Sequence, residues 1–177
     1  MVDTIETARL ILRPWRAQDL EELERLFADP AVRQGRHFPP ERIITIAESS
    51  LRQWQRNGFG PWAALDKSTG QWIGRVGLDE LDDWPDAHKV EVGWELHHAW
   101  WGKGLATEAG LAALQFGFGE HQLERIISVT ALWNTAARRV MERVGLEYQG
   151  TRQWKGVEVV WYALDRSVWQ ARRLASA

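Results

Sequence analysis

The fold is decided by the stretch Glu95–Ala109, which reads ELHHAWWGKGLATEA. We expect a strand to end within it, a turn to form at Gly102 and Gly104, and an amphipathic helix to begin at Leu105. Glycine has no Cβ, so successive backbone N–H groups can turn toward one point. The first turn of a helix adds unsatisfied N–H donors and a positive potential. The stretch is therefore suited to holding a phosphate or a pyrophosphate.

Two common nucleotide-binding motifs fail here on residue identity. A P-loop needs a serine or threonine directly after its lysine, whereas Gly104 follows Lys103. A dinucleotide fingerprint needs a third glycine at the position of Thr107. The sequence therefore disfavours ATP and NAD as ligands, while a plain glycine turn into a helix remains the structural alternative.

Hydrophobic spacing along the rest of the chain predicts a mixed α/β fold. The expected order is one strand, two helices, three strands, a helix, a strand, a helix and two strands. The predicted strands cover residues 9–13, 62–65, 72–76, 89–96, 125–131, 147–154 and 157–164. The predicted helices lie between residues 19 and 30, 43 and 57, 105 and 118, and 134 and 144.

Local signals add detail to this order of elements. Asp19 is expected to cap the first helix, because a short side-chain acceptor precedes the apolar repeat. Residues 31–42 are expected to form a loop, and residues 66–70 a five-residue hairpin turn. Leu111 and Leu114 are expected to share one apolar stripe of the helix that follows the glycines.

Composition limits the classes of function. The 177 residues fit a single domain over 1–177, and a net charge of -2 argues against generic nucleic-acid binding. No apolar run approaches the about 20 residues that span a bilayer, and acids stand near the N-terminus where a secretory signal has basic residues. With no cysteine there is no thiol nucleophile or thiolate metal site. We expect no metal cofactor, no membrane partner and a cytoplasmic location.

The aromatic composition is unusual, with 12 tryptophans and 2 tyrosines. The tryptophans fit either an aromatic-rich core or the lining of a groove. A mechanism that needs a tyrosine must use Tyr148 or Tyr162.

Residues Trp101–Ala106 resemble the pyrophosphate loop of the GNAT acetyltransferases, a Gln/Arg-x-x-Gly-x-Gly/Ala pattern that binds coenzyme A. Trp101 departs from the usual first residue, but backbone amides make most of that cradle. Further stretches resemble the RimJ/RimL branch of the superfamily, in an order that covers nearly the whole chain. These stretches are Thr7–Pro14, Glu91–Leu96, Ala106–Ala109 and the segment from Asn134 to Leu146.

The resemblance implies a GNAT fold. Its mixed central sheet would have about seven strands, with parallel central strands that splay apart. About four helices and a short C-terminal helix would flank the sheet. The pantetheine arm of acetyl-CoA, the expected cosubstrate, would lie between the strands at 89–96 and 125–131, and one backbone N–H would stabilise the thioester oxyanion. The implied cofactor-binding residues are Trp94, Leu96, Trp101, Gly102, Lys103, Gly104, Leu105, Ala106, Thr107 and Asn134.

Candidate catalytic residues are less well defined. Asn134 matches the family's asparagine near the thioester, although an asparagine before a helix is also a common N-cap. Glu91 and Glu158 are the candidate bases, with ordinary ion-pair or surface roles as the alternative. His97 or His98 could also act as a base, but adjacent residues of an extended segment face opposite ways. The general acid is missing, because Ala137 stands where the RimL branch has a serine.

The expected activity is direct transfer of an acetyl group from acetyl-CoA to a primary amine in a ternary complex. No residue offers a convincing covalent nucleophile. The acceptor would be a protein N-terminus or a small-molecule amine, and the acidic run at 79–86 is either an attractant for a cationic acceptor or a solvated loop. A non-catalytic, regulatory acyl-CoA-binding module is the alternative. The sequence does not predict an oligomeric state.

Overall fold

The protein is built on an eight-stranded mixed sheet, seen here in a computed structural model that describes residues 4–33 and 42–175. The strand order is β1-β2-β3-β4-β5-β6-β8-β7. The strands are β1 Ile5–Glu6, β2 Leu10–Arg13, β3 Pro61–Asp66, β4 Trp72–Glu80, β5 Val90–Leu96, β6 Arg125–Ala131, β7 Glu147–Trp154 and β8 Val157–Asp165. The helices are α1 Asp19–Ala28, α2 Pro30–Arg33, α3 Arg42–Asn57, α4 Leu105–Gln115, α5 Thr135–Arg143 and α6 Arg166–Ala175, with a 3-10 turn at His98–Trp100 and a π-helical turn at Phe116–Glu120.

The middle of the sheet contains its one parallel pair among the described strands, β5 and β6. β4 and β5 pair from Gly74↔Leu96 to Glu80↔Val90, along the whole length of β5. β5 and β6, in contrast, share only the register pair Glu91↔Ile127. The two parallel strands therefore meet near their starts and part toward their carboxyl ends, which confirms the predicted splay.

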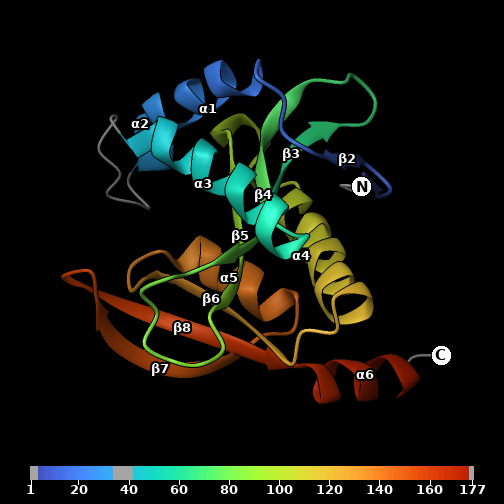
Figure 1. Ribbon diagram of the computed structural model, residues 1–177, viewed down its shortest axis with the longest axis vertical. Coiled ribbons are helices and arrows are strands. Elements are labelled where there is room, and N and C mark those ends of the chain that lie inside the picture. The colour runs from blue at the N-terminus through green and yellow to red at the C-terminus, as the bar shows by residue number, and fades with distance from the viewer. Residues whose placement is uncertain (1–3, 34–41, 176–177) are drawn as a thin grey trace.

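Helices cover both faces of the sheet (Figure 1). Leu23, Leu26 and Phe27 of α1 pack with Ala63 and Trp72 on one face. The larger core lies on the other face, where α4 and α5 pack against β2 to β6. Figure 1 shows α1 to α3 at one end of the view and β7, β8 and α6 at the other, with β5 and β6 between them. The gap between the parallel strands is thus central in the molecule.

The predicted order of elements is confirmed, with local differences. The two-residue strand β1 pairs with β2 and makes the sheet eight strands instead of about seven. The loop expected at 31–42 is wrong for residues 31–33, which lie in α2, and for Arg42, which begins α3; residues 34–41 lie outside the described residues. The hairpin turn at 66–70 is confirmed, because Gly70 N–H donates to the Asp66 carbonyl at 2.8 Å. No helix of the described part is long and apolar enough to cross a membrane.

Two side-chain predictions are wrong. Asp19 is the first residue of α1 and not its cap; Gln18 is the N-cap. The Asp19 carboxylate instead receives both arms of the buried Arg13 guanidinium, at 2.7 and 2.8 Å, because a buried cation needs a paired anion. Leu111 is 49% exposed and does not share the buried stripe of Leu114. The small residues Ala109 and Ala113 take that place, since they let α4 lie close to the sheet.

Candidate active site

The glycine turn before α4 has the geometry of an anion cradle. Gly102 and Gly104 have φ angles of 73° and 76°, in the left-handed region that favours glycine. A Cβ at Gly102 would meet no other atom within 4 Å, so the space beside the turn is open. Thr107, in the first turn of α4, has a buried hydroxyl without a hydrogen-bond partner. The turn, the helix N-terminus and this hydroxyl together fit a phosphate group.

Two side-chain hydrogen bonds hold the vertex at which β5 and β6 part. Ser128 Oγ donates to the Val92 carbonyl at 2.9 Å. The Val129 N–H of β6 donates to Glu91 Oε1, also at 2.9 Å, and Glu91 is only 5% exposed. A β-strand N–H that loses its backbone partner needs another acceptor when it is buried. The Glu91 carboxylate provides this acceptor, so Glu91 has a structural role in the splay.

The edge of β5 that faces the gap consists of every second residue. His97 N–H donates to the Ile73 carbonyl of β4, so the backbone N–H and C=O groups of the odd-numbered residues point toward β4 and away from the gap. The backbone groups of Val92, Trp94 and Leu96 point toward the gap. The predicted backbone contacts at Trp94 and Leu96 therefore lie on the correct edge. However, Trp101 Nε1 donates to the Leu96 carbonyl at 2.7 Å. The peptide groups of Trp94 thus lie between two carbonyls that already accept side-chain donors.

Asn134 is confirmed as the N-cap of α5. Its Oδ1 accepts a hydrogen bond from Ala137 N–H at 3.1 Å. The cofactor contact of its side-chain NH₂ group stays a prediction. Asn134 lies between the end of β6 at Ala131 and the start of α5, so it stands near the end of the gap that is opposite the vertex.

A buried charge cluster, which sequence reasoning missed, lies beside Glu91 on the face covered by α1 and α3. Arg75 pairs with Glu95 at 3.1 Å and with Asp79 at 2.8 Å. Arg75 and Glu95 are opposite one another in the register of β4 and β5, as are Asp79 and Glu91. Burial lowers the pKa of Arg75, but the neighbouring Glu95 and Asp79 carboxylates raise it, with the net effect above its ordinary value. The signal in the sequence was an arginine within an apolar strand.

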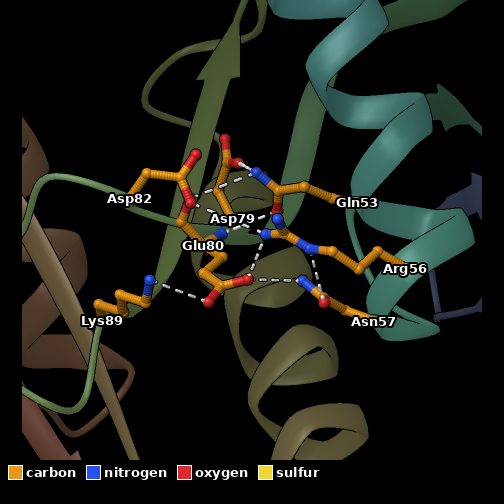
Figure 2. Close-up of polar contacts among 7 residues, drawn as sticks. All are labelled: Gln53, Arg56, Asn57, Asp79, Glu80, Asp82 and Lys89. Carbon is orange, nitrogen blue, oxygen red and sulfur yellow. Dashed lines mark hydrogen bonds and ion pairs between the residues drawn. The ribbon is translucent and has the colours of Figure 1, made fainter.

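The C-terminal half of α3 is fixed to this cluster (Figure 2). The Gln53 amide donates to Asp79 at 2.5 Å and accepts from Glu80 N–H at 2.8 Å. Arg56 and Asn57 both donate to the Glu80 carboxylate, which Lys89 also approaches at 3.2 Å. The start of the acidic run is thus structured and not simply solvated. These contacts hold α3 along one side of the charged face.

Glu158 is placed less favourably for base catalysis than Glu91. It is exposed and lies at the start of β8, after the β7–β8 turn. Alternation along β8 puts it on the same face as the buried Val160 and Tyr162, which pack with α4. Glu91 faces the opposite side, so the structure does not bring the two candidate bases together.

Neither tyrosine lies where a general acid is missing. Tyr162 is 1% exposed, and its hydroxyl accepts from Arg138 and donates to Glu142, both at 3.2 Å. Tyr148 is exposed and lies on β7, at the edge of the sheet. This geometry does not identify the general acid, so water, Thr135 and direct departure of the thiolate stay the alternatives.

The two histidines before the glycine turn line a hollow of about 370 Å³ beneath α1. His97 packs edge-on against Trp72, and burial lowers its pKa. His98 is hydrogen-bonded to Asp29, and this bond lowers the pKa of Asp29. The two histidines contact different partners although both line this hollow, and His98 lies in the 3-10 turn and not in an extended segment. His98 links the end of α1 to the turn that leads into the cradle.

Most of the tryptophans belong to the core, but two exposed ones flank the gap. Trp54, Trp62, Trp72 and Trp84 are buried, and six of the other tryptophans are partly buried and pack against the core. Trp101 is 48% exposed beside the end of β5, and Trp133 is 63% exposed just before Asn134. The core interpretation of the tryptophan-rich composition therefore holds for most of the set, and a groove lined by Trp101 and Trp133 stays a prediction.

Comparisons with known proteins agree on one family. Residues 9–147 match the family described as the acetyltransferase (GNAT) domain. The chain is 35% identical over 134 residues to YkkB of Bacillus subtilis (strain 168), an uncharacterized protein, covering 73% of this chain and 76% of YkkB. A solved acetyltransferase from Agrobacterium tumefaciens str. C58 is 25% identical with a TM-score of 0.84, covering 93% of this chain and 95% of that one.

A second solved structure shares the fold and holds coenzyme A. It is RimL, a ribosomal L7/L12 alpha-N-protein acetyltransferase in complex with coenzyme A. Its TM-score is 0.76 at 15% identity, and the match covers 94% of this chain and 99% of RimL. At this identity the likeness concerns the fold alone.

Proposed function

The chain belongs to the GNAT acetyltransferase family, and from this membership we propose that it transfers an acetyl group from acetyl-CoA directly to a primary amine. One observation carries the proposal. The vertex at Glu91 lies near the start of β5, and the glycine turn follows the other end of β5 after the 3-10 turn His98–Trp100, so a cofactor held at the glycine turn would extend along the gap toward a carboxylate.

Acetyl-CoA supplies the acetyl thioester. The residues that would hold it are the backbone amides and side chains of Trp101–Thr107 for the pyrophosphate, with Trp94 and Leu96 along the arm and Asn134 at the other side of the gap. Support comes from the left-handed Gly102 and Gly104 and from the unpartnered Thr107 hydroxyl. The N–H groups of the β5 edge are the donors proposed for the oxyanion of the thioester.

Glu91 is the proposed general base. A carboxylate can accept several hydrogen bonds, so Glu91 can hold Val129 N–H through Oε1 and still receive a proton from an ammonium group. Its position at the vertex, on the face with Arg75 and Glu95, supports this role. Glu158 is the weaker candidate because it lies on the other face.

The acceptor is proposed to be a peptide N-terminus or a small-molecule amine. The stretches that resemble the RimJ/RimL branch support a peptide N-terminus. The buried Glu91 and Glu95 of β5 and the partly buried Asp79 of β4 support a cationic acceptor in either case. Family and fold alone do not decide between these substrates.

The test is release of coenzyme A thiol from acetyl-CoA in the presence of a panel of amines. The panel includes N-terminal peptides, polyamines and aminoglycosides, and calorimetry measures coenzyme A binding in parallel. Turnover with at least one amine is expected. Tight binding of coenzyme A without turnover of any amine would instead favour the non-catalytic acyl-CoA-binding module.

A further inference from the structure

A charged contact from the start of the chain reaches the glycine turn. Arg9 Nη1 donates to the Lys103 carbonyl at 2.8 Å. The same guanidinium donates through Nε to Glu108 Oε2 at 2.7 Å. The other carboxylate oxygen, Oε1, accepts from Arg9 N–H at 2.8 Å and from the Thr7 hydroxyl at 2.6 Å. Both oxygens of Glu108 are thus held by the segment Thr7–Arg9, and Arg9 extends beyond them to the turn.

This contact fixes the direction of one peptide group of the cradle. The described chain has no cis peptide bond, so the Lys103 carbonyl and the Gly104 N–H point to opposite sides of their shared peptide plane. When Arg9 holds the carbonyl on its side, the Gly104 N–H must point to the other side. The next peptide is fixed as well, because Glu108 N–H donates to the Gly104 carbonyl at 3.0 Å. Gly104 is therefore oriented from both sides, although glycine is otherwise the most freely rotating residue.

The same contact balances charge at the helix start. Glu108 stands in the first turn of α4, where its negative charge stabilises the helix but repels an anion bound at the N-terminus. Arg9 lies against that carboxylate and offsets the repulsion. Burial raises the pKa of Glu108, but hydrogen bonds from Thr7 and Arg9 outweigh this effect and hold the pKa below its ordinary value. The Glu108 carboxylate therefore stays ionised at neutral pH.

We propose that Arg9 is a positioning residue for the pyrophosphate of the cofactor. It acts through the Lys103–Gly104 peptide by turning the Gly104 N–H toward the phosphate and by offsetting the charge of Glu108. The inference rests on the proposed use of acetyl-CoA. It assigns a binding role to the N-terminal hairpin, which lies four strands away from β6 in the sheet order.

The experiment compares two acetyl donors in the full-length protein, with an amine that the wild type acetylates. Acetyl-CoA carries the pyrophosphate, whereas S-acetylpantetheine lacks it. Arg9→Gln is expected to lower kcat/KM for acetyl-CoA by about tenfold, the size of one hydrogen bond to a charged group, and to leave kcat/KM for S-acetylpantetheine unchanged. Calorimetry is expected to show a similar loss of coenzyme A affinity. Arg52→Gln, which removes an exposed ion pair on α3, is the control for lost charge.

Three results would overturn the inference. Equal losses with both donors would mean that Arg9 only supports the fold, and unchanged values with both would mean that it has no part in binding. A loss in Arg9→Gln that Arg52→Gln reproduces would reduce the effect to net charge. Failure of the wild type to bind coenzyme A at all is a separate outcome, because it would refute the proposed function before Arg9 is tested.

Discussion

Replacing Glu91 with glutamine or alanine separates its two roles. Gln keeps an oxygen in the position of Oε1, so it can still accept from Val129 N–H, but it cannot take a proton from an amine. Ala removes the acceptor as well. Because Glu91 and Val129 are only 5% and 7% exposed, water cannot easily replace the lost oxygen.

The magnitudes follow from this geometry. A buried N–H left without an acceptor costs about 1–3 kcal/mol, so Glu91→Ala is expected to lower the free energy of unfolding by about 2 kcal/mol. For a chain of this length each kcal/mol shifts the midpoint by about 2–4 °C, so the melting temperature falls by about 4–8 °C. Glu91→Gln is expected to melt near the wild type and to lower turnover by about 10²-fold, the low end of general-base effects.

Thermal unfolding followed by circular dichroism measures the melting temperature, and thiol release at saturating acetyl-CoA measures the turnover. Coenzyme A affinity, measured by calorimetry, is expected to stay nearly unchanged in Glu91→Gln. Wild-type turnover in Glu91→Gln across the pH range would refute the base assignment and direct attention to Glu158. Wild-type melting of Glu91→Ala would refute the structural role at the vertex.

Three further predictions concern the cradle and the helix starts. Gly104→Val is expected to abolish coenzyme A binding in calorimetry and to introduce about 1–2 kcal/mol of backbone strain. Gly70→Val is the matched control, because Gly70 has a similar φ of 71° but lies away from the site, and this variant should bind coenzyme A normally. Asn134→Asp is expected to keep the helix cap and the melting temperature but to weaken acetyl-CoA binding or turnover. Asn134→Ala is expected also to lower the free energy of unfolding by about 1 kcal/mol. Normal binding and turnover by Asn134→Asp would mean that the residue is a cap alone. The pKa of Glu108 in the folded protein lies below its ordinary 4.5, so its contribution to stability is complete above about pH 4.5 and is lost as the pH falls through the folded value. Glu108→Gln should therefore make the free energy of unfolding, measured with denaturant, fall less steeply at acid pH than in the wild type.

The local pattern of the chain was sufficient for much of the fold and for the cradle. The two glycines before an amphipathic helix predicted the turn, and the resemblance implied the splay between β5 and β6. The turn rests on residues that are neighbours in sequence, whereas the splay joins two strands that are far apart in sequence and came from the resemblance alone. The predicted cap at Asp19 is wrong because Arg13 competes with the helix N-terminus for the Asp19 carboxylate. Sequence spacing does not show which of these two partners the carboxylate binds.

Side-chain contacts between distant segments were out of reach of the sequence. The bond from Val129 N–H to Glu91 joins residues 38 positions apart, and the contact of Arg9 with Lys103 spans 94 positions. The charge cluster at Arg75 likewise depends on the register of β4 against β5, because a one-residue shift would move the side chains of one strand to the other face of the sheet. Glu158 shows the same limit, because its face depends on the register of β8.

The single register pair between β5 and β6 has a mechanical consequence. Five strands lie on one side of it and three on the other, so the sheet has two parts, which we call leaves, joined by one short line of backbone pairing. A pantetheine arm lying in the gap would join the leaves where the backbone does not. Saturating coenzyme A at 100 times its Kd should then raise the free energy of unfolding by about 2.7 kcal/mol. Amide hydrogen exchange should slow on both leaves together, as expected if the ligand takes the place of a strand between them.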